Sequence, residues 1–209
     1  MIISILLIPF AYLLGSIPTS VWLGKATKGI DLREHGSGNA GTSNAIRVLG
    51  WPIGLVVLIF DVLKGYLAVS LAGFQSIWNE GSEAWMILKI VLGVVAVVGH
   101  IYPVFAGFRG GKGVATIAGV GFALNPLATL AAMGIYIIVL LIFRISSLGS
   151  LSAGLSYPFW VIFVFDTPYI SLLIFSILVT FVLILTHLSN IRRLIRGEEN
   201  SLNKKKRRK

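Results

Sequence analysis

Residues 126–143 read PLATLAAMGIYIIVLLIF, an uninterrupted apolar stretch without any Asp, Glu, Lys or Arg. As a helix rising about 1.5 Å per residue, this stretch is nearly as long as the ~30 Å hydrocarbon core of a bilayer is thick. The whole chain has the same character, because 56% of its 209 residues are hydrophobic and only 12% are charged. A soluble domain usually has about 25% charged residues. The sequence therefore predicts an all-α integral membrane protein.

Further apolar runs lie on both sides of this stretch. Four are long enough to cross a bilayer as helices: about 2–24, 51–73, 85–106 and 169–187. A fifth run, at about 150–165, is slightly shorter and contains Pro158. The apolar stretch 114–124 is too short to span a bilayer alone, so we expect a short or partly re-entrant helix buried among its neighbours. Together these runs predict seven transmembrane segments.

The distribution of positive charge predicts the orientation. Lys and Arg occur in the loops 25–50, 107–113 and 144–149 and in the tail, whereas the loops 74–84 and 166–168 have none. Because cytoplasmic loops retain positive charge, we expect the N-terminus outside and the C-terminus in the cytoplasm. Two successive inside loops require the chain to leave and return between them, with the reversal at Asn125-Pro126.

The same pattern predicts one polytopic membrane domain over residues 1–198, followed by a basic cytoplasmic tail over 199–209. The chain has 18 Lys and Arg residues against 8 Asp and Glu, a formal net charge of +10, and half of its cations lie beyond residue 191. This basic region follows a hydrophobic span directly and has no interleaved aromatic residues. We therefore expect contact with anionic lipids and no nucleic-acid partner, and we expect a monomer.

The first inside loop has the composition of a phosphate site. Residues 28–50 read KGIDLREHGSGNAGTSNAIRVLG, and their glycines allow consecutive backbone N–H groups to converge on an anion. The side chains that could add donors are Ser37, Asn39, Ser43, Asn44 and Arg47. A flexible glycine-rich linker would have a similar composition, so this loop alone leaves both interpretations open.

The second inside loop strengthens the phosphate interpretation. Residues 99–116 read GHIYPVFAGFRGGKGVAT, with Gly110, Gly111 and Gly113 around Lys112, and the loop leads directly into the short stretch 114–124. Backbone N–H groups at a helix N-terminus, with a lysine beside them, form an anion site. The spacing is not that of a Walker A loop, so it does not indicate nucleotide binding. Two such loops on one face indicate two phosphates.

The third polar cluster follows the last apolar run. Residues 187–199 read HLSNIRRLIRGEE, in which His187 and Asn190 share one helix face and could both meet a substrate at the membrane edge. For His187 taken alone, a structural or interfacial role is the favoured alternative. Ser147, in the loop 144–149, could line a head-group pocket or simply cap a helix.

Two other features limit the chemistry. Asp61 and Lys64 lie three residues apart inside an apolar run, so we expect them to face protein and to form a structural pair. The chain has no cysteine, no histidine followed by an acid at acyltransferase spacing, and no carboxylate pair spaced for magnesium. We therefore expect neither a metal nor a cofactor.

Three strings in order carry a family resemblance: GSGNAGTSNAIRVLG (36–50), GHIYPVFAGFRGGKGVAT (99–116) and HLSNIRRLIRGEE (187–199). With them, the chain resembles the bacterial acyl-phosphate-dependent glycerol-3-phosphate 1-acyltransferases, multi-span enzymes of phospholipid synthesis. The resemblance implies transfer of an acyl group from acyl phosphate to the 1-hydroxyl of sn-glycerol 3-phosphate, giving lysophosphatidic acid and phosphate. It also implies the bacterial plasma (inner) membrane, with the active site on the cytoplasmic side.

The resemblance assigns roles to particular residues. It implies catalytic roles for Ser37, Arg47, Lys112, His187 and Asn190. It implies substrate or phosphate binding by Ser43, Gly110, Gly111, Gly113 and Ser147. Glu199 matches an acidic residue of the family for which we expect a structural role.

Acyl phosphate is a mixed anhydride with an activated carbonyl, so the protein must mainly screen two anions and align the attack. We expect no covalent intermediate, and our hypothesis is that a substrate phosphate oxygen accepts the hydroxyl proton, with His187 as the other candidate. The competing function is a transporter of phosphate or lipid head groups, which would use similar anion sites. The predicted outer loops lack comparable polar clusters, which disfavours a path across the membrane.

Overall fold

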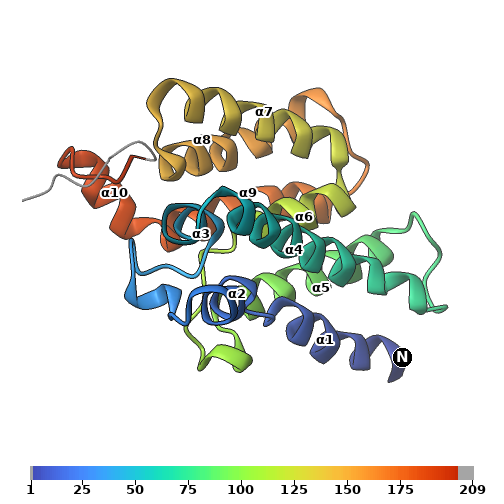
Figure 1. The fold of residues 1–209 in the computed structure, drawn as a ribbon. Coiled ribbons are helices and arrows are strands. Elements are labelled where there is room, and N and C mark those ends of the chain that lie inside the picture. The colour runs from blue at the N-terminus through green and yellow to red at the C-terminus, as the bar shows by residue number, and fades with distance from the viewer. Residues whose placement is uncertain (1, 202–209) are drawn as a thin grey trace, which may run out of the picture.

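The computed structural model describes residues 2–201, and in the first helix it describes the side chains from Leu6 onward. Within this part of the chain the secondary structure is helical, with no strand (Figure 1). The α-helices are α1 (Ile2–Gly15), α2 (Thr19–Lys28), α3 (Thr42–Leu49), α4 (Trp51–Ser70), α5 (Glu83–Ile101), α6 (Val114–Leu124), α7 (Pro126–Phe143), α8 (Ser146–Phe159), α9 (Ile170–Thr186) and α10 (Leu188–Ile195). Short 3₁₀ turns cover Leu32–Glu34, Leu71–Phe74 and Val104–Ala106, and a π turn covers Trp160–Val164.

The long apolar runs of the sequence are helices in the structure. Five stretches are long and apolar enough to cross a membrane: Leu6–Lys28, Trp51–Phe74, Glu83–Ala106, Pro126–Phe143 and Ser146–Val164. Together α9 and α10 form a further apolar stretch, which is bent by 64° between the two helices. The predicted all-α, multi-span architecture is therefore confirmed.

The first apolar run is interrupted, although the sequence predicts one continuous segment over 2–24. Helix α1 ends at Gly15 and α2 begins at Thr19. Pro18 explains the break, because proline has no N–H to donate and disfavours the helical conformation of the residue before it, Ile17. The carbonyl of Ile17, at this break, accepts a hydrogen bond from Nζ of Lys64 on α4, at 3.0 Å.

Helix α6 is the short fourth segment, and none of its side chains is exposed. It lies very close to α4. A Cβ atom at Gly119 would collide with the carbonyl of Val62, and one at Gly65 would collide with the carbonyl of Thr116. Small residues allow this close approach of helices in a membrane. The prediction of a short helix buried among its neighbours is thus confirmed.

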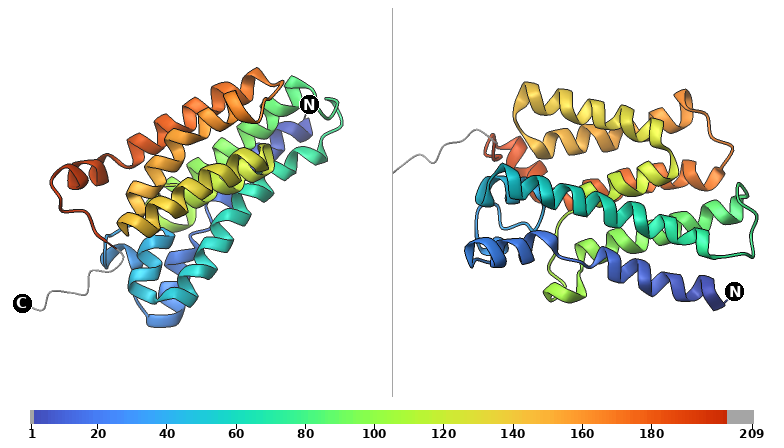
Figure 2. Two further views of the ribbon diagram at one scale, coloured as in Figure 1. Left: turned by 90° about the horizontal axis from the view of Figure 1, so that it is seen from above. Right: turned by 45° about the vertical axis from the view of Figure 1, so that its right-hand side comes forward.

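The polar loops meet at one end of the helix bundle. Arg33 Nη1 donates to the carbonyl of Ala106 at 2.6 Å, which links the loop before α3 to the loop before α6. The hydroxyl of Ser43 lies 2.7 Å from that of Ser146, which links α3 to the start of α8. The turns after α4 and α6 lie at the other end (Figures 1 and 2).

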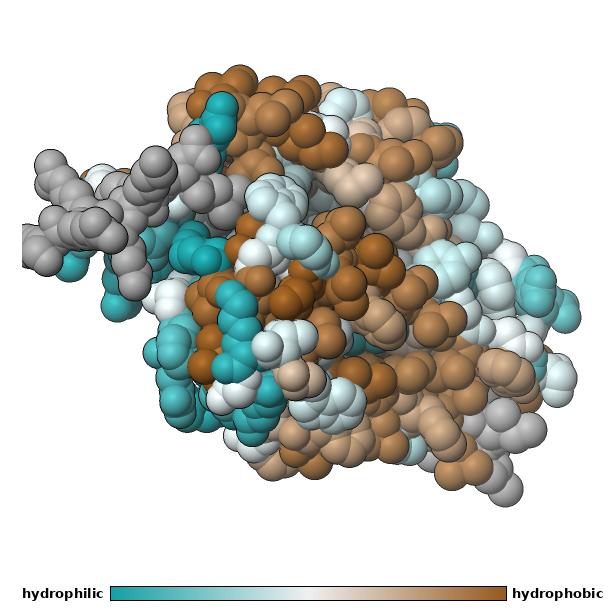
Figure 3. Space-filling view, in the orientation of Figure 1, coloured by the Kyte–Doolittle hydropathy of each residue, from teal (hydrophilic) through white to brown (hydrophobic). Residues whose placement is uncertain are grey.

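The surface matches this division. Strongly hydrophilic residues gather mainly at the end where α3 and α10 lie, and apolar residues cover the helices between the two ends (Figure 3). On α7, for example, the last three side chains, Leu141, Ile142 and Phe143, are all exposed. Such an apolar belt fits hydrocarbon rather than water as the surrounding solvent.

Candidate active site

Glu199 joins helices α8 and α10. Its Oε1 accepts hydrogen bonds from the hydroxyl of Ser147 (3.0 Å) and from Nδ2 of Asn190 (2.6 Å), and its Oε2 accepts one from Nε of Arg193 (2.7 Å). Burial acts to raise the pKa of Glu199, but the hydrogen bonds from Arg193, Asn190 and Ser147 together outweigh burial and lower it. Glu199 is therefore an ionised acceptor, which supports the structural role predicted for it.

The same contacts attach Glu199 to helices α8 and α10. The sequence places Glu199 at the start of the basic tail, whereas in the structure it packs with Ser147 and Asn190 of the membrane domain. The rest of the predicted tail, residues 202–209, lies outside the described residues.

Cationic side chains from three separate segments lie within electrostatic reach of Glu199. The charges of Glu199 and Arg193 act on both Arg47, from α3, and Lys112, from the loop before α6. His187, at the junction of α9 and α10, lies within electrostatic reach of Lys112 and Glu199. Burial, together with repulsion from Arg193, lowers the pKa of Lys112 to about 8. A concentration of positive charge around one carboxylate attracts anions with more than one negative charge.

Asn44 shapes the first loop from within. Its side chain is 2% exposed, and its Nδ2 donates to the carbonyls of Leu32, His35 and Asn39 at 3.0–3.1 Å. Its Oδ1 accepts the N–H of Ser37 at 2.8 Å. With both ends of the amide engaged in this way, no free donor remains for a ligand. The direct substrate contact predicted for Asn44 is therefore corrected to a structural role in folding the loop.

The other polar residues of the first loop are more accessible. Ser37 is exposed, and Asn39 and Ser43 are partly buried. The Ser43 hydroxyl belongs to a short chain, because Ser146 lies 2.7 Å from it and 3.0 Å from the hydroxyl of Tyr136 on α7. This chain fixes the position of Ser43 relative to α7 and α8. Ser43 thus lies next to the start of α8, the helix whose Ser147 contacts Glu199.

The glycines of the second loop have a different role from the predicted phosphate binding. The N–H of Gly110 donates to the carbonyl of Ile101 at 3.0 Å, and that of Gly111 donates to the carbonyl of His100 at 3.2 Å. These two amides therefore fold the loop against the end of α5 and are not free for a phosphate, which corrects their predicted role. Gly113, with a positive φ of 83°, is the N-cap of α6 and follows Lys112 directly. The first N–H groups of a helix have no intrahelical partner, so those of α6 are candidates for binding a phosphate.

The geometry of His187 fixes its protonation pattern. The ring is 3% exposed, and its Nδ1 lies 2.8 Å from the carbonyl oxygen of Leu183. A carbonyl oxygen only accepts, so Nδ1 carries the proton and donates it. In the neutral ring Nε2 is then an acceptor. His187 can therefore accept a hydrogen bond from a hydroxyl, but while neutral it cannot donate one from Nε2 to a phosphate.

Asn190 retains one free atom. Its Nδ2 is bound to Glu199, whereas its buried Oδ1 has no hydrogen-bond partner among residues 2–201. Buried polar atoms without partners are rare in proteins. An acceptor of this kind beside His187 suits a ligand that donates from a hydroxyl.

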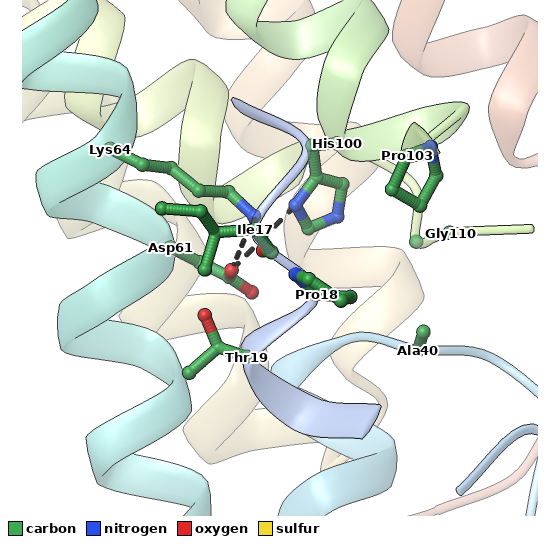
Figure 4. Close-up of a pocket in the computed structure, with 10 residues that line it drawn as sticks. Ile17, Pro18, Thr19, Ala40, Asp61, Lys64, His100, Pro103 and Gly110 are labelled. Atoms are coloured by element: carbon green, nitrogen blue, oxygen red, sulfur yellow. Dashed lines mark hydrogen bonds and ion pairs between the residues drawn. The ribbon is translucent and has the colours of Figure 1, made fainter. Parts of the chain in front are cut away.

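The predicted pairing of Asp61 and Lys64 is confirmed. Lys64 Nζ lies 2.7 Å from Asp61 Oδ1, and both side chains are buried in α4. Figure 4 shows the pair in a small cavity with His100 and with Ile17, Pro18 and Thr19 of the break between α1 and α2. The pair thus lies behind the second loop, where it has a structural rather than a ligand-facing position.

Two residues of this region are absent from the sequence-based predictions. Arg33 joins Asp31, at 2.7 Å, to the carbonyls of Ala106 and Arg109 in the second loop. The hydrogen bonds from Arg33 lower the pKa of Asp31 to about 2, against a smaller opposing effect of burial. His100, the second residue, is buried at the end of α5. Both lie in the loops quoted from the sequence, but only their tertiary contacts distinguish them from ordinary polar residues.

Comparison with known proteins identifies the family. The family described as glycerol-3-phosphate acyltransferase matches residues 5–197 of this chain. The chain belongs to that family. It is therefore an acyltransferase, as the sequence predicts.

Relatives of this family match over almost the whole chain. The glycerol-3-phosphate acyltransferase of Chlorobaculum tepidum is 41% identical over 97% of both chains, and that of Prochlorococcus marinus is 40% identical over 96% of this chain and 98% of its own. Among solved structures, the integral membrane glycerol 3-phosphate acyltransferase PlsY (YgiH) in its glycerol 3-phosphate form is 38% identical. It covers 95% of this chain and 94% of its own, with a TM-score of 0.84. The lysophosphatidic acid form of the same enzyme has a TM-score of 0.81 at 37% identity, with the same coverage.

Proposed function

We propose that this acyltransferase moves an acyl group from acyl phosphate to the 1-hydroxyl of sn-glycerol 3-phosphate, with lysophosphatidic acid and inorganic phosphate as products. One observation carries the proposal. Arg47, Lys112 and His187 come from three segments far apart in the sequence, and all three lie within electrostatic reach of one carboxylate, that of Glu199, which hydrogen bonds fix between α8 and α10. The structural relative was obtained with glycerol 3-phosphate and with lysophosphatidic acid, which supports the acceptor and the product.

The arrangement fits two phosphate-bearing reactants. Both carry negative charge and repel each other, so Arg47 and Lys112 lower the cost of bringing them together. The N–H groups at the start of α6 add hydrogen bonds to one phosphate. Holding the reactants in an aligned pair can contribute roughly 7–11 kcal/mol in favourable intramolecular cases. The main work of the site is therefore binding and orientation.

The transfer itself needs one bond to form and one to break. The 1-hydroxyl oxygen attacks the acyl carbonyl, and the bond between that carbonyl carbon and the bridging phosphate oxygen breaks, so that inorganic phosphate leaves. The hydroxyl proton passes to a phosphate oxygen of a substrate. Asn190 Oδ1 and Nε2 of His187 are acceptors that orient the hydroxyl before the attack. A covalent protein adduct is not required, because the carbonyl is already activated.

We also propose where the reaction occurs. With seven membrane segments, the N-terminus would lie outside and the polar end of the bundle in the cytoplasm of a bacterial inner membrane; the cations at that end support this orientation. Glycerol 3-phosphate then reaches the site from water, whereas the acyl chain enters sideways between apolar helices. The exposed apolar side chains along the bundle support lateral entry from lipid.

A reconstitution experiment tests the proposal directly. The purified full chain in lipid vesicles is given acyl phosphate and radiolabelled glycerol 3-phosphate. We expect labelled lysophosphatidic acid and inorganic phosphate in equal amounts. Passage of label into the vesicles without acylation would instead indicate the carrier function. Replacement of acyl phosphate by acyl-CoA determines whether the enzyme accepts only the acyl phosphate anhydride as donor.

The pKa of Lys112 predicts an alkaline limit to activity. A lysine with a pKa of about 8 carries its charge below that pH and loses it above, so kcat/KM is expected to fall as the pH rises through about 8. In Lys112→Arg the guanidinium stays charged, and we expect the alkaline limb to move upward by more than about one pH unit. An unchanged limb in this variant would contradict the assignment.

The role of His187 predicts a different pH response. Because His187 orients the hydroxyl and a phosphate oxygen takes the proton, His187→Gln should raise the KM for glycerol 3-phosphate while the shape of the pH profile is retained. The comparison is made with full profiles of kcat/KM and kcat for both proteins. Disappearance of the acidic limb in the variant would show that His187 is the general base.

A further inference from the structure

His100 is buried between the second loop and α6. It lies near the end of α5 and is 6% exposed. Its backbone carbonyl accepts the N–H of Gly111, and its Nδ1 lies 3.1 Å from the hydroxyl of Thr116. Gly111 comes directly before Lys112, and Thr116 is in the first turn of α6 directly after it. His100 is therefore bound to the chain on both sides of Lys112, through its backbone carbonyl before that residue and through its ring after it.

The packing of the loop against this ring is unusually close. A Cβ atom at Gly111 would collide with Nε2 of His100, and one at Gly110 would collide with the carbonyl of His100. Only glycine allows the backbone to lie this near the ring. The two glycines that the sequence suggested as phosphate ligands are thus needed for the loop to fit around His100.

A charged pair lies beside the same ring nitrogen. Asp61 Oδ1 lies 3.7 Å from Nδ1 of His100 and 2.7 Å from Nζ of Lys64. Lys64 Nζ also donates to the carbonyl of Ile17, at the break between α1 and α2. Figure 4 shows these side chains pointing toward one another beside Gly110. The ring is consequently supported from the α1–α2 break, from α4 and from α6.

We propose that His100, held by Thr116 and by the Asp61–Lys64 pair, is a positioning residue that fixes Lys112 and the start of α6 for binding the phosphate group of glycerol 3-phosphate. The inference rests on the proposed function and extends it to residues behind the site. His100 is not catalytic, because its ring is buried and Gly111 separates it from any ligand of Lys112. Its effect is to remove conformational freedom from a glycine-rich loop before the ligand binds.

Thr116→Val is the sharpest test, because it removes one hydroxyl and changes little volume. We expect the KM for glycerol 3-phosphate to rise about 3- to 10-fold, the change that loss of one hydrogen bond typically produces, with a smaller change in kcat. The matched control is Thr129→Val. Thr129 is also buried, and its hydroxyl donates to the carbonyl of Asn125, at the other end of α6. Equal kinetics in the two variants would overturn the proposal.

Binding measurements separate positioning from general damage to the fold. Affinity for glycerol 3-phosphate, and for inorganic phosphate as a simpler probe, is measured from thermal stabilisation of the detergent-purified protein. We expect Thr116→Val to weaken both affinities in the wild-type background but not in Lys112→Ala, because His100 acts through Lys112. The same loss in both backgrounds would show that His100 does not act through Lys112.

A conservative variant completes the test. His100→Asn keeps a polar atom near the position of Nδ1 and should retain more phosphate affinity than His100→Leu, which keeps volume but cannot bond to Thr116. Equal affinity in these two variants contradicts the inference. The phosphate readout needs no acyl donor, so it still decides the role of His100 if the wild-type protein transfers no acyl group from acyl phosphate.

Discussion

Replacing Lys112 by alanine should lower kcat/KM for glycerol 3-phosphate by about 10²- to 10³-fold, the loss typical of removing one donor that stabilises developing negative charge. Lys112 lies within electrostatic reach of His187, Arg193 and Glu199 and is partly buried. Because the effective dielectric constant is lower there than in bulk water, the charge of Lys112 interacts more strongly with a bound anion. Neither water nor another lysine of the described chain can replace it at the start of α6.

The measurement is the initial rate of lysophosphatidic acid formation by purified protein, with insertion checked by chromatographic behaviour and thermal unfolding. Lys25→Ala is the matched control, because Lys25 is an exposed lysine of α2 at the same end of the bundle. We expect activity within about twofold of wild type for the control, as for most surface changes. Near-normal activity of a folded Lys112→Ala protein would remove Lys112 from the site.

Replacing Lys64 by methionine is expected to have the largest effect on stability. Asp61 would lose its nearest cation while remaining buried inside α4. Breaking a buried ion pair on one side costs about 3–5 kcal/mol, which corresponds to roughly 6–20 °C in Tm for a protein of this size. The carbonyl of Ile17 would also lose its hydrogen bond from Lys64. The variant should therefore give little folded protein, or protein that unfolds at much lower temperature.

The double variant Asp61→Asn with Lys64→Met separates the charge from the packing. Removing both charges leaves no unpaired ion in the interior, so most of the stability lost in Lys64→Met should return. Thermal unfolding of the three proteins in one detergent gives the comparison. A Lys64→Met protein as stable as wild type would show that the pair is not needed to hold α4 against the α1–α2 break.

The membrane segments could be predicted from the sequence because lipid imposes a simple rule. A helix that satisfies its own backbone groups must present apolar side chains along its full length, and the run 126–143 does so without interruption. The same rule identified 114–124 as too short to span and therefore buried. The rule did not predict the break between α1 and α2 at Pro18, because hydropathy carries no information on a missing backbone N–H.

The residues of the candidate site could be predicted from the sequence only in part. Arg47, Lys112 and His187 stand out as charged or titratable groups next to glycines and helix ends, and in the structure all three lie within electrostatic reach of Glu199. Asn44 looks the same in the sequence, yet it binds only the loop's own backbone. Whether an amide faces a ligand or the chain depends on how the loop closes, which residue type and spacing do not specify.

The sequence by itself determined that this protein is surrounded by lipid, where its apolar stretches lie and which polar residues are available for phosphate chemistry, because these follow from local composition and helix length. Only the tertiary structure determined that the N–H groups of Gly110 and Gly111 donate to carbonyls at the end of α5. It likewise determined that the ring of His100 packs against Gly111, the residue before Lys112. The physical reason is that such contacts join residues on different helices. Their geometry is set by how closely α4, α5 and α6 approach one another, and not by any one segment.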